Sequence, residues 1–179
     1  GLRQIATRHD ARAKTASESI GSTIIALTDR NDLKRMEDLR KKRLVTRDID
    51  SLSGWLGAKG KLADHISAKE DQPHLFSTKY SYPDVYSYLL SGEADAAVIP
   101  TCELENISNA HLFKVIDEEK TSLACKSSSP LYPDFVFSSF PDASPEVVKN
   151  FTVSLLTMPK MPDGAAWGIA NDFRSVLQL

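Results

Sequence analysis

The chain has 179 residues, of which 41% are hydrophobic and 26% charged, a composition typical of an ordinary globular protein. Its formal net charge is -2, which excludes a general electrostatic attraction to nucleic acid or to an anionic membrane, so any anion site must be local. No apolar run reaches transmembrane length and no signal peptide is visible; since the first residue is Gly rather than Met, we expect the natural protein to be longer.

The first two thirds of the chain alternate between strand-like and helix-like segments. β-branched and apolar runs predict strands at 2–9, 19–30, 43–46, 73–79 and 111–117, with one more between Gly92 and Pro100. Helices are predicted after an N-cap at Asp32, over 53–66, and from Pro83 to Gly92. From about residue 20 to 117 this order predicts a mainly parallel sheet with helices on both faces.

The sequence changes character after residue 117. Residues 118–135 are rich in Ser, Pro and Lys, which favours an irregular crossing segment. A strand is predicted at 135–140, and a helix begins at Ser144 with Pro145 in its first turn. We interpret residues 158–173 as a loop and expect a last short helix from Asn171.

A turn rich in serine separates the predicted strand 43–46 from the predicted helix 53–66. Ser51, Ser53 and Gly54 stand where a helix N-terminus leaves backbone N–H groups unpaired, and Trp55 follows them. These groups could bind a small oxyanion, because hydroxyls add donors and Gly54 permits close approach. Alternatively Ser51 or Ser53 only caps the helix, which the pattern alone favours.

The side chains that most often carry metal or thiol chemistry give little signal. The four histidines show no metal-binding spacing, and we expect no metal and no cofactor. Cys102 and Cys125 follow neighbouring predicted strands, so a disulfide is slightly favoured over two separate buried thiols. A cysteine nucleophile is the least favoured alternative, because no familiar Cys/His pattern accompanies it.

Tyrosines gather around the start of the predicted helix at Pro83. Tyr80 and Tyr82 precede or open that helix and are candidates for the mouth of a binding site, whereas Tyr86 and Tyr88 suit packing. Paired acids such as Glu103 and Glu105 are better explained as solvated side chains than as acid/base pairs. We therefore expect no catalytic residues.

Two long stretches, "GSTIIALTDRNDLKRMEDLRKKRLVTRDIDSLSGWL" and "FSTKYSYPDVYSYLLSGEADAAVIPTCELE", resemble the phosphonate-type periplasmic binding proteins in the order and spacing of their motifs. The later stretches "CKSSSPLYPDF", "SLLTMP" and "DGAAWGIANDFRSV" are most similar to a subgroup of that family. This subgroup comprises the extracytoplasmic sensor domains of histidine kinases similar to the tetrathionate sensor. The resemblance covers nearly the whole chain.

The resemblance implies an α/β fold of the type 2 periplasmic-binding-protein class, in which two lobes close on a ligand. Residues 29–119 would form a complete lobe, and 1–28 with 120–179 would form crossing strands and part of the other lobe. Family members carry a further strand-helix-strand segment before the strand at 2–9, so most of that other lobe is expected to be absent from this sequence.

The same resemblance implies which residues bind the ligand. The family's hydroxyl-rich turn corresponds to Ser51, Leu52, Ser53 and Gly54, with Leu52 in place of a hydroxyl residue. Tyr82 stands where the transporters often have histidine, and Asp95 matches the aspartate of the family's "aD" motif.

The implied function is a non-enzymatic, extracytoplasmic sensor domain that binds a small-molecule anion in a cleft between lobes and signals by lobe closure. Its expected partners are the membrane and kinase segments of the same full-length chain, which would anchor it to the membrane, and no nucleic acid. The alternative is the solute-binding protein of a phosphonate-type ABC importer. An enzyme with a cysteine thiolate is a third, less favoured hypothesis.

Overall fold

A computed structural model describes residues 1–179, except for the side chain of Gln178, and the contacts divide the chain into two compact units. The smaller unit comprises Gly1–Ile20, Ser122–Ala124 and Leu131–Gln178. The larger unit comprises Gly21–Thr121, Cys125–Pro130 and Leu179. The expected lobe began at residue 29, whereas the larger unit also includes the strand that precedes this residue.

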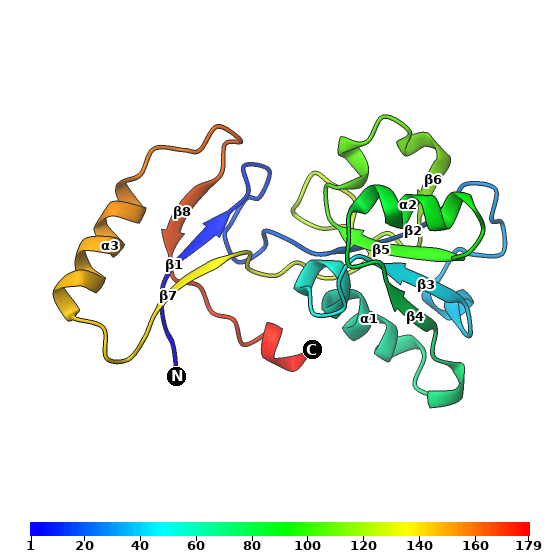
Figure 1. Cartoon of the computed structure of the whole chain (residues 1–179), viewed down its shortest axis with the longest axis horizontal. Coiled ribbons are helices and arrows are strands. Elements are labelled where there is room, and N and C mark those ends of the chain that lie inside the picture. The colour runs from blue at the N-terminus through cyan, green and yellow to red at the C-terminus, as the bar shows by residue number, and fades with distance from the viewer. The chain divides into compact units, whose positions relative to one another are not determined.

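The larger unit is built on one five-stranded sheet (Figure 1). In spatial order its strands are β4 (His74–Ser77), β3 (Arg43–Thr46), β5 (Ala96–Pro100), β2 (Ser22–Leu27) and β6 (Phe113–Val115). β3 runs parallel to β4 and β5, while β2 runs antiparallel to β5 and β6. The predicted α/β class is therefore confirmed, but the sheet is mixed rather than mainly parallel. Parallel pairing requires a crossover connection, and only the β3–β4 and β4–β5 connections contain an α-helix.

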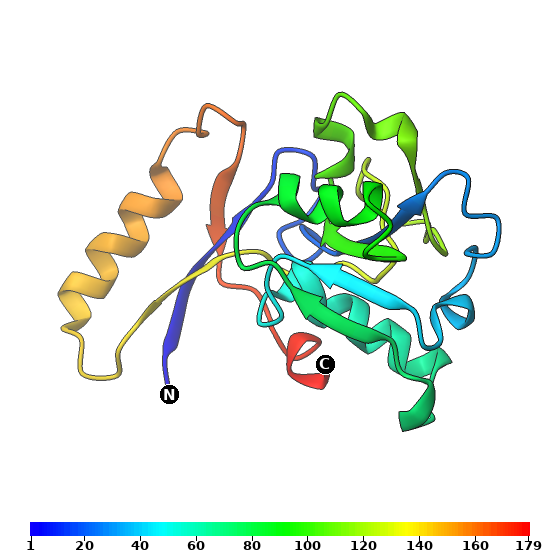
Figure 2. The same cartoon turned by 45° about the vertical axis from the view of Figure 1, so that its right-hand side comes forward.

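Helices α1 (Gly57–His65) and α2 (Tyr82–Leu90) each help to cover one apolar face of this sheet (Figure 2). Side chains alternate along the strands, so Ile24, Leu44 and Val98 pack with α1, while their neighbours Ile25, Val45 and Ile99 pack with α2. Burial of both faces fixes the ends of the strands firmly in space, which matters because the candidate site lies at those ends.

The segment before α1 differs from the single helix predicted over 53–66. A π-helix, η2 (Leu52–Leu56), precedes α1, with Ser51 as its N-cap. The short helix expected after Asp32 is a 3₁₀ turn, η1 (Met36–Leu39), and its N-cap is Arg35. Asp32 instead pairs with Arg30, at 2.9 Å between Oδ1 and Nε, so it does not cap this turn.

An irregular segment, residues 125–130, packs beside β2 within the larger unit. Its buried serine hydroxyls replace strand partners: Ser129 Oγ accepts from the backbone N–H of Ser22 at 2.9 Å, and Ser128 Oγ accepts from that of Ile24 at 3.0 Å. Cys102 and Cys125 form a disulfide with a Cα–Cα distance of 5.0 Å. Of the three alternatives for the cysteines, which were a disulfide, two separate thiols and a nucleophile, the disulfide is therefore confirmed. The disulfide links the segment to the loop after β5.

The smaller unit has a three-stranded antiparallel sheet with spatial order β7 (Val136–Ser139), β1 (Arg3–His9) and β8 (Ala166–Ile169), and one helix, α3 (Pro145–Thr157). Phe151 of α3 stacks on Phe137 of β7 with ring centroids 5.9 Å apart. No residue of α3 is buried, so this unit has a thin core. β8 lies inside the predicted loop 158–173; its four residues include a glycine and give no alternating pattern.

Candidate functional site

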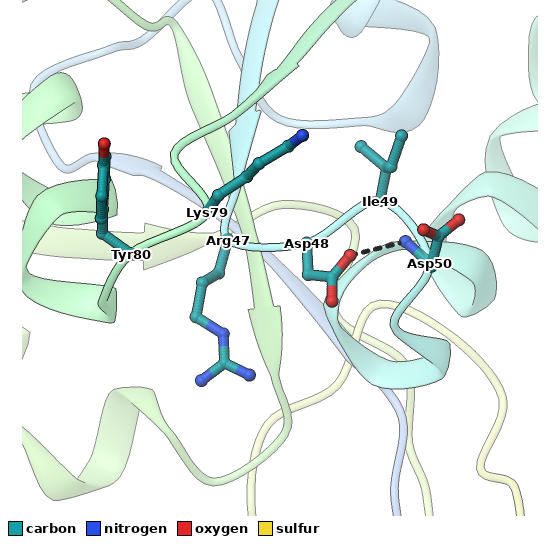
Figure 3. A pocket seen from close by; sticks show the side chains of 6 residues that line it. All are labelled: Arg47, Asp48, Ile49, Asp50, Lys79 and Tyr80. Carbon is teal, nitrogen blue, oxygen red and sulfur yellow. Dashed lines mark hydrogen bonds between the residues drawn. The ribbon is translucent and has the colours of Figure 1, made fainter.

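A surface depression of about 390 Å³ lies where β3 and β4 end, at the carboxyl edge of the sheet in the larger unit (Figure 3). Two loops line it, and both directly follow their strands. Its lining residues are Arg47, Asp48, Ile49, Asp50, Lys79 and Tyr80. The carboxyl edge of parallel strands is where open α/β sheets bind ligands, so the topology favours this depression as the site.

Backbone hydrogen bonds hold the two loops together past the last residues of the strands. The N–H of Thr78 donates to the carbonyl of Thr46 at 3.0 Å, and the N–H of Lys79 donates to that of Arg47 at 3.0 Å. Lys79 adopts a left-handed backbone conformation, with φ of 59°. In the other loop, Asp48 Oδ1 accepts from the N–H of Asp50 at 2.9 Å, which closes a tight turn.

The depression carries two positive and two negative side chains. Arg47, Lys79, Asp48 and Asp50 are all exposed, and within the described residues none of them forms an ion pair. The Arg47 guanidinium instead lies over the ring of Tyr82, with Cζ 5.0 Å from the ring centroid. Burial raises the pKa of the half-buried Tyr82, and the nearby charge of Arg47 partly opposes that effect. The two cations are thus not paired with a carboxylate among the described residues.

The serine turn next to the depression acts as a helix cap. Ser51 Oγ accepts from the N–H of Gly54 at 3.0 Å, and the Ser51 carbonyl accepts from Trp55 and Leu56 at 2.9 and 3.0 Å. A Cβ at Gly54 would lie only 2.9 Å from Ser51 Oγ, so contact with the cap explains this glycine. Ser53 is only 8% exposed. The N–H groups of residues 54–56 therefore bond to the chain itself, and an anion contact at Ser51, Ser53 or Gly54 stays a prediction.

The aromatic candidates divide between the site and the core. Tyr80 is 82% exposed and lines the depression. Tyr82 reaches the site only through its contact with Arg47. Trp55 is partly buried against the core on the α1 face, which explains its presence without a ligand. A ligand contact from any of the predicted residues stays a prediction.

Asp95 lies away from the other candidates. It directly precedes β5 and bonds to Arg43 at the start of β3, with Oδ2–Nε at 3.1 Å, and to Arg30, with Oδ1–Nη1 at 3.0 Å. The depression follows the end of β3, whereas Asp95 is at the amino edge of the same sheet. Its two arginine contacts give it a structural role, and we leave it out of the candidate site.

The four charged residues of the depression were not among the site residues predicted from the sequence. Arg47, Asp48 and Asp50 lie in the same stretch as the serine turn, and Lys79 directly precedes Tyr80. The available signal was their position at the ends of two predicted strands, with Lys79 the last residue of the strand predicted at 73–79, because parallel strands end at one edge. In the described part of the chain, no helix has the length and apolar character needed to cross a membrane.

Comparisons with known proteins agree on the type of domain. The family described as "ABC transporter, phosphonate, periplasmic substrate-binding protein" matches residues 2–173. The tetrathionate sensor histidine kinase TtrS of Salmonella typhimurium is 31% identical over an alignment of 165 residues, and the match covers 88% of this chain and 28% of TtrS. The chain thus spans less than a third of that relative.

Among solved structures, XAC2383 from Xanthomonas citri bound to chloride ion superposes with a TM-score of 0.66 at 13% identity, covering 99% of this chain and 67% of that one. The same protein bound to ATP gives a TM-score of 0.61 at 14% identity, with 96% and 68% covered. At this level of identity the similarity establishes the fold.

Proposed function

The chain belongs to the phosphonate-type family of periplasmic substrate-binding proteins of ABC transporters, and from this premise we propose that it is an extracytoplasmic, non-enzymatic sensor domain for a small oxyanion. The proposal places the ligand at the depression lined by Arg47, Asp50 and Lys79. The full-length protein would also contain a membrane segment and a kinase segment, as a histidine kinase does.

One observation carries the choice of site. Two cationic side chains, Arg47 and Lys79, line a depression at the carboxyl edge of the sheet and form no ion pair with the neighbouring acids in the described structure. Two other arginines of the larger unit, Arg30 and Arg43, are instead paired with Asp32 and Asp95. Cations that make no ion pair with a neighbouring carboxylate keep their N–H donors available for an anionic ligand.

The sensor role is favoured over transport by the similarity of the chain to TtrS. TtrS is named as a tetrathionate sensor histidine kinase, and its match covers 88% of this chain. We propose that ligand binding shifts an equilibrium between open and closed arrangements of the domain, which requires a ligand with different affinity for the two states. Small-angle scattering with and without ligand tests this part; an unchanged radius of gyration at saturation contradicts it.

Isothermal titration tests the anion. Tetrathionate, thiosulfate, sulfate and methylphosphonate are each titrated into the purified chain, with chloride as the control anion. We expect saturable binding of at least one of the four oxyanions. Both cysteines are in a disulfide, so heat from tetrathionate would report binding rather than oxidation of a thiol. Absence of saturable binding for all four contradicts the proposal.

A second candidate, the solute-binding protein of an ABC importer, is favoured by the description of the matched family itself. It shares the fold and the site, so binding data do not separate the two functions. The full-length reading frame does: an attached membrane helix and kinase support the sensor, and a neighbouring permease gene supports import.

A further inference from the structure

β3 carries an arginine at each end, and the two have different surroundings. Arg43, at its first residue, donates to Asp95 through Nε at 3.1 Å and to the carbonyl of Gly92 at 2.9 Å. Arg47, directly after its last residue, has no carboxylate within ion-pair distance in the described structure, although Asp48 is next to it. The guanidinium of Arg47 is therefore the one whose donors are available.

The position of Arg47 is fixed from two sides. Its carbonyl accepts from the N–H of Lys79 at 3.0 Å, which holds the backbone against the β4 loop. Its guanidinium lies over the ring of Tyr82, the first residue of α2, with Cζ 5.0 Å from the centroid. The ring attracts the guanidinium and restrains it, and among the described residues no protein atom accepts a hydrogen bond from its N–H groups, which leaves them for a ligand.

The positive and negative charges of the depression balance. For binding an anion, the direction of the hydrogen-bond donors therefore matters more than the total charge. Asp48 and Asp50 offset Arg47 and Lys79, so the local field alone gives a small anion little attraction. A planar guanidinium can nevertheless bind two oxygens of one oxyanion through parallel hydrogen bonds, which an ammonium cannot do. Figure 3 shows the side chains of Arg47 and Lys79 leaving their loops in different directions, so the two cations are not equivalent.

Resting on the proposed function, we infer that Arg47 recognises the oxyanion by a bidentate contact and that Tyr82 is a positioning residue which orients this arginine. The ligand class is an oxyanion with two oxygens on one centre, such as a sulfonate, sulfate or phosphonate group. Lys79 then serves as a second, non-directional charge. Neither Arg47 nor the Tyr82–Arg47 pair was among the ligand contacts expected from the sequence.

Titration of tetrathionate, sulfate and methylphosphonate into single variants tests the role of Arg47. We expect Arg47→Ala to weaken the binding of whichever probe binds the wild-type chain by roughly 10- to 100-fold, the value of hydrogen bonds to a charged group. Arg47→Lys keeps the charge and should still lose about tenfold. Lys59→Ala, at an exposed position on α1, makes the same charge change as Arg47→Ala and should leave affinity within about twofold.

The role of Tyr82 is tested by its dependence on Arg47. Tyr82→Phe keeps the aromatic face and should bind as the wild type does, whereas Tyr82→Leu keeps an apolar side chain but removes the face and should weaken binding by about 3- to 10-fold. In an Arg47→Ala background the Tyr82→Leu change should have no further effect, because Tyr82 acts through Arg47. A purely structural tyrosine would give the same loss in both backgrounds.

The outcomes separate the inference from the proposed function. If the wild-type chain binds a probe and Arg47→Ala binds it equally well, the inference is overturned and the proposed function stands. The same holds if Tyr82→Leu weakens binding equally with and without Arg47. If the wild type binds no probe, the proposed function fails, and the inference fails with it. Circular dichroism of each variant confirms that it is folded before titration.

Discussion

At the scale of single residues, Ser51 has two candidate roles that substitution can separate. Its hydroxyl accepts from the N–H of Gly54 at 3.0 Å, the geometry of an N-cap. We predict that Ser51→Ala lowers the free energy of unfolding by about 1 kcal/mol, while Ser51→Asp, which also caps, retains it. Urea denaturation measures both. Ligand affinity should not change in Ser51→Ala; a stable alanine variant that loses ligand binding would mean that the hydroxyl serves the ligand instead.

Lys79 is held in a conformation that suits glycine, with φ of 59°. For a residue with a Cβ this left-handed conformation costs about 1 kcal/mol. We predict that Lys79→Gly raises the free energy of unfolding by about that amount. Lys79→Ala keeps the Cβ and should bring no such gain. Both changes remove the ammonium and should weaken oxyanion binding equally, as titration would show.

Gly92 allows the reverse substitution as a control, in which a Cβ is added at a residue with positive φ. It has φ of 74°, and a Cβ there would meet no atom within 4 Å, so Gly92→Ala changes backbone strain without a clash. Thermal unfolding should show a loss of about 1 kcal/mol for Gly92→Ala. Equal stability of Lys79→Gly and Lys79→Ala would contradict the strain argument. A confirmed result would mean that the chain keeps a destabilising residue beside the depression, as functional sites often do.

At the scale of elements, β3 and β5 are joined at their amino edge by Asp95. Burial raises the pKa of Asp95, but hydrogen bonds from the side chain and backbone of Arg43, together with Arg30, outweigh that effect and lower the pKa to about 2. The ordinary value is 3.8, so the folded state binds the proton more weakly than the unfolded state. Asp95 therefore contributes stability above about pH 4, and this contribution is lost as the pH falls toward 2.

The corresponding prediction concerns the slope of stability against pH. Between pH 4 and pH 2, the free energy of unfolding of the wild type should fall more steeply than that of Asp95→Asn, which has no carboxyl to titrate. Urea denaturation at several pH values in this window measures both slopes. Parallel slopes would show that Asp95 titrates alike in the folded and unfolded chains.

The elements also show how far the sequence determines the fold. Segments with strong periodicity, such as α2 and the buried strand β5, are at their predicted places. The direction of β2 was not predictable, because an apolar run indicates a strand but not its neighbours. β8 was missed because it is short, and its pairing with β1 depends on residues more than 150 positions away.

The candidate site shows the same limit. Its location at the end of β3 was predictable, because strand-to-helix transitions mark the carboxyl edge of a parallel sheet. The hydroxyl pattern indicated Ser51 and Ser53, yet Ser51 caps the helix and the N–H groups of residues 54–56 bond to Ser51. Lys79 joins Arg47 only because β4 is the neighbour of β3, and strand order is not visible in either segment alone.

At the scale of the whole molecule, the two units differ in how much apolar surface they bury. The larger unit has a cluster of fully buried side chains on each face of its sheet. In the smaller unit α3 has no buried residue, and Phe135 and Phe140 are 68% and 72% exposed. Since burial of apolar surface is the main stabilising term, the smaller unit should open at a lower free energy than the larger one.

The two tryptophans make this difference measurable, because Trp55 belongs to the larger unit and Trp167 to the smaller. Trp55→Phe leaves fluorescence from the smaller unit alone, and Trp167→Phe leaves it from the larger. We predict that the Trp167 signal changes at a lower urea concentration than the Trp55 signal. The disulfide lies within the larger unit, so reduction should lower the midpoint of the Trp55 transition. Superimposed transitions would instead show one cooperative domain in which the apolar side chains of α3 do not limit stability.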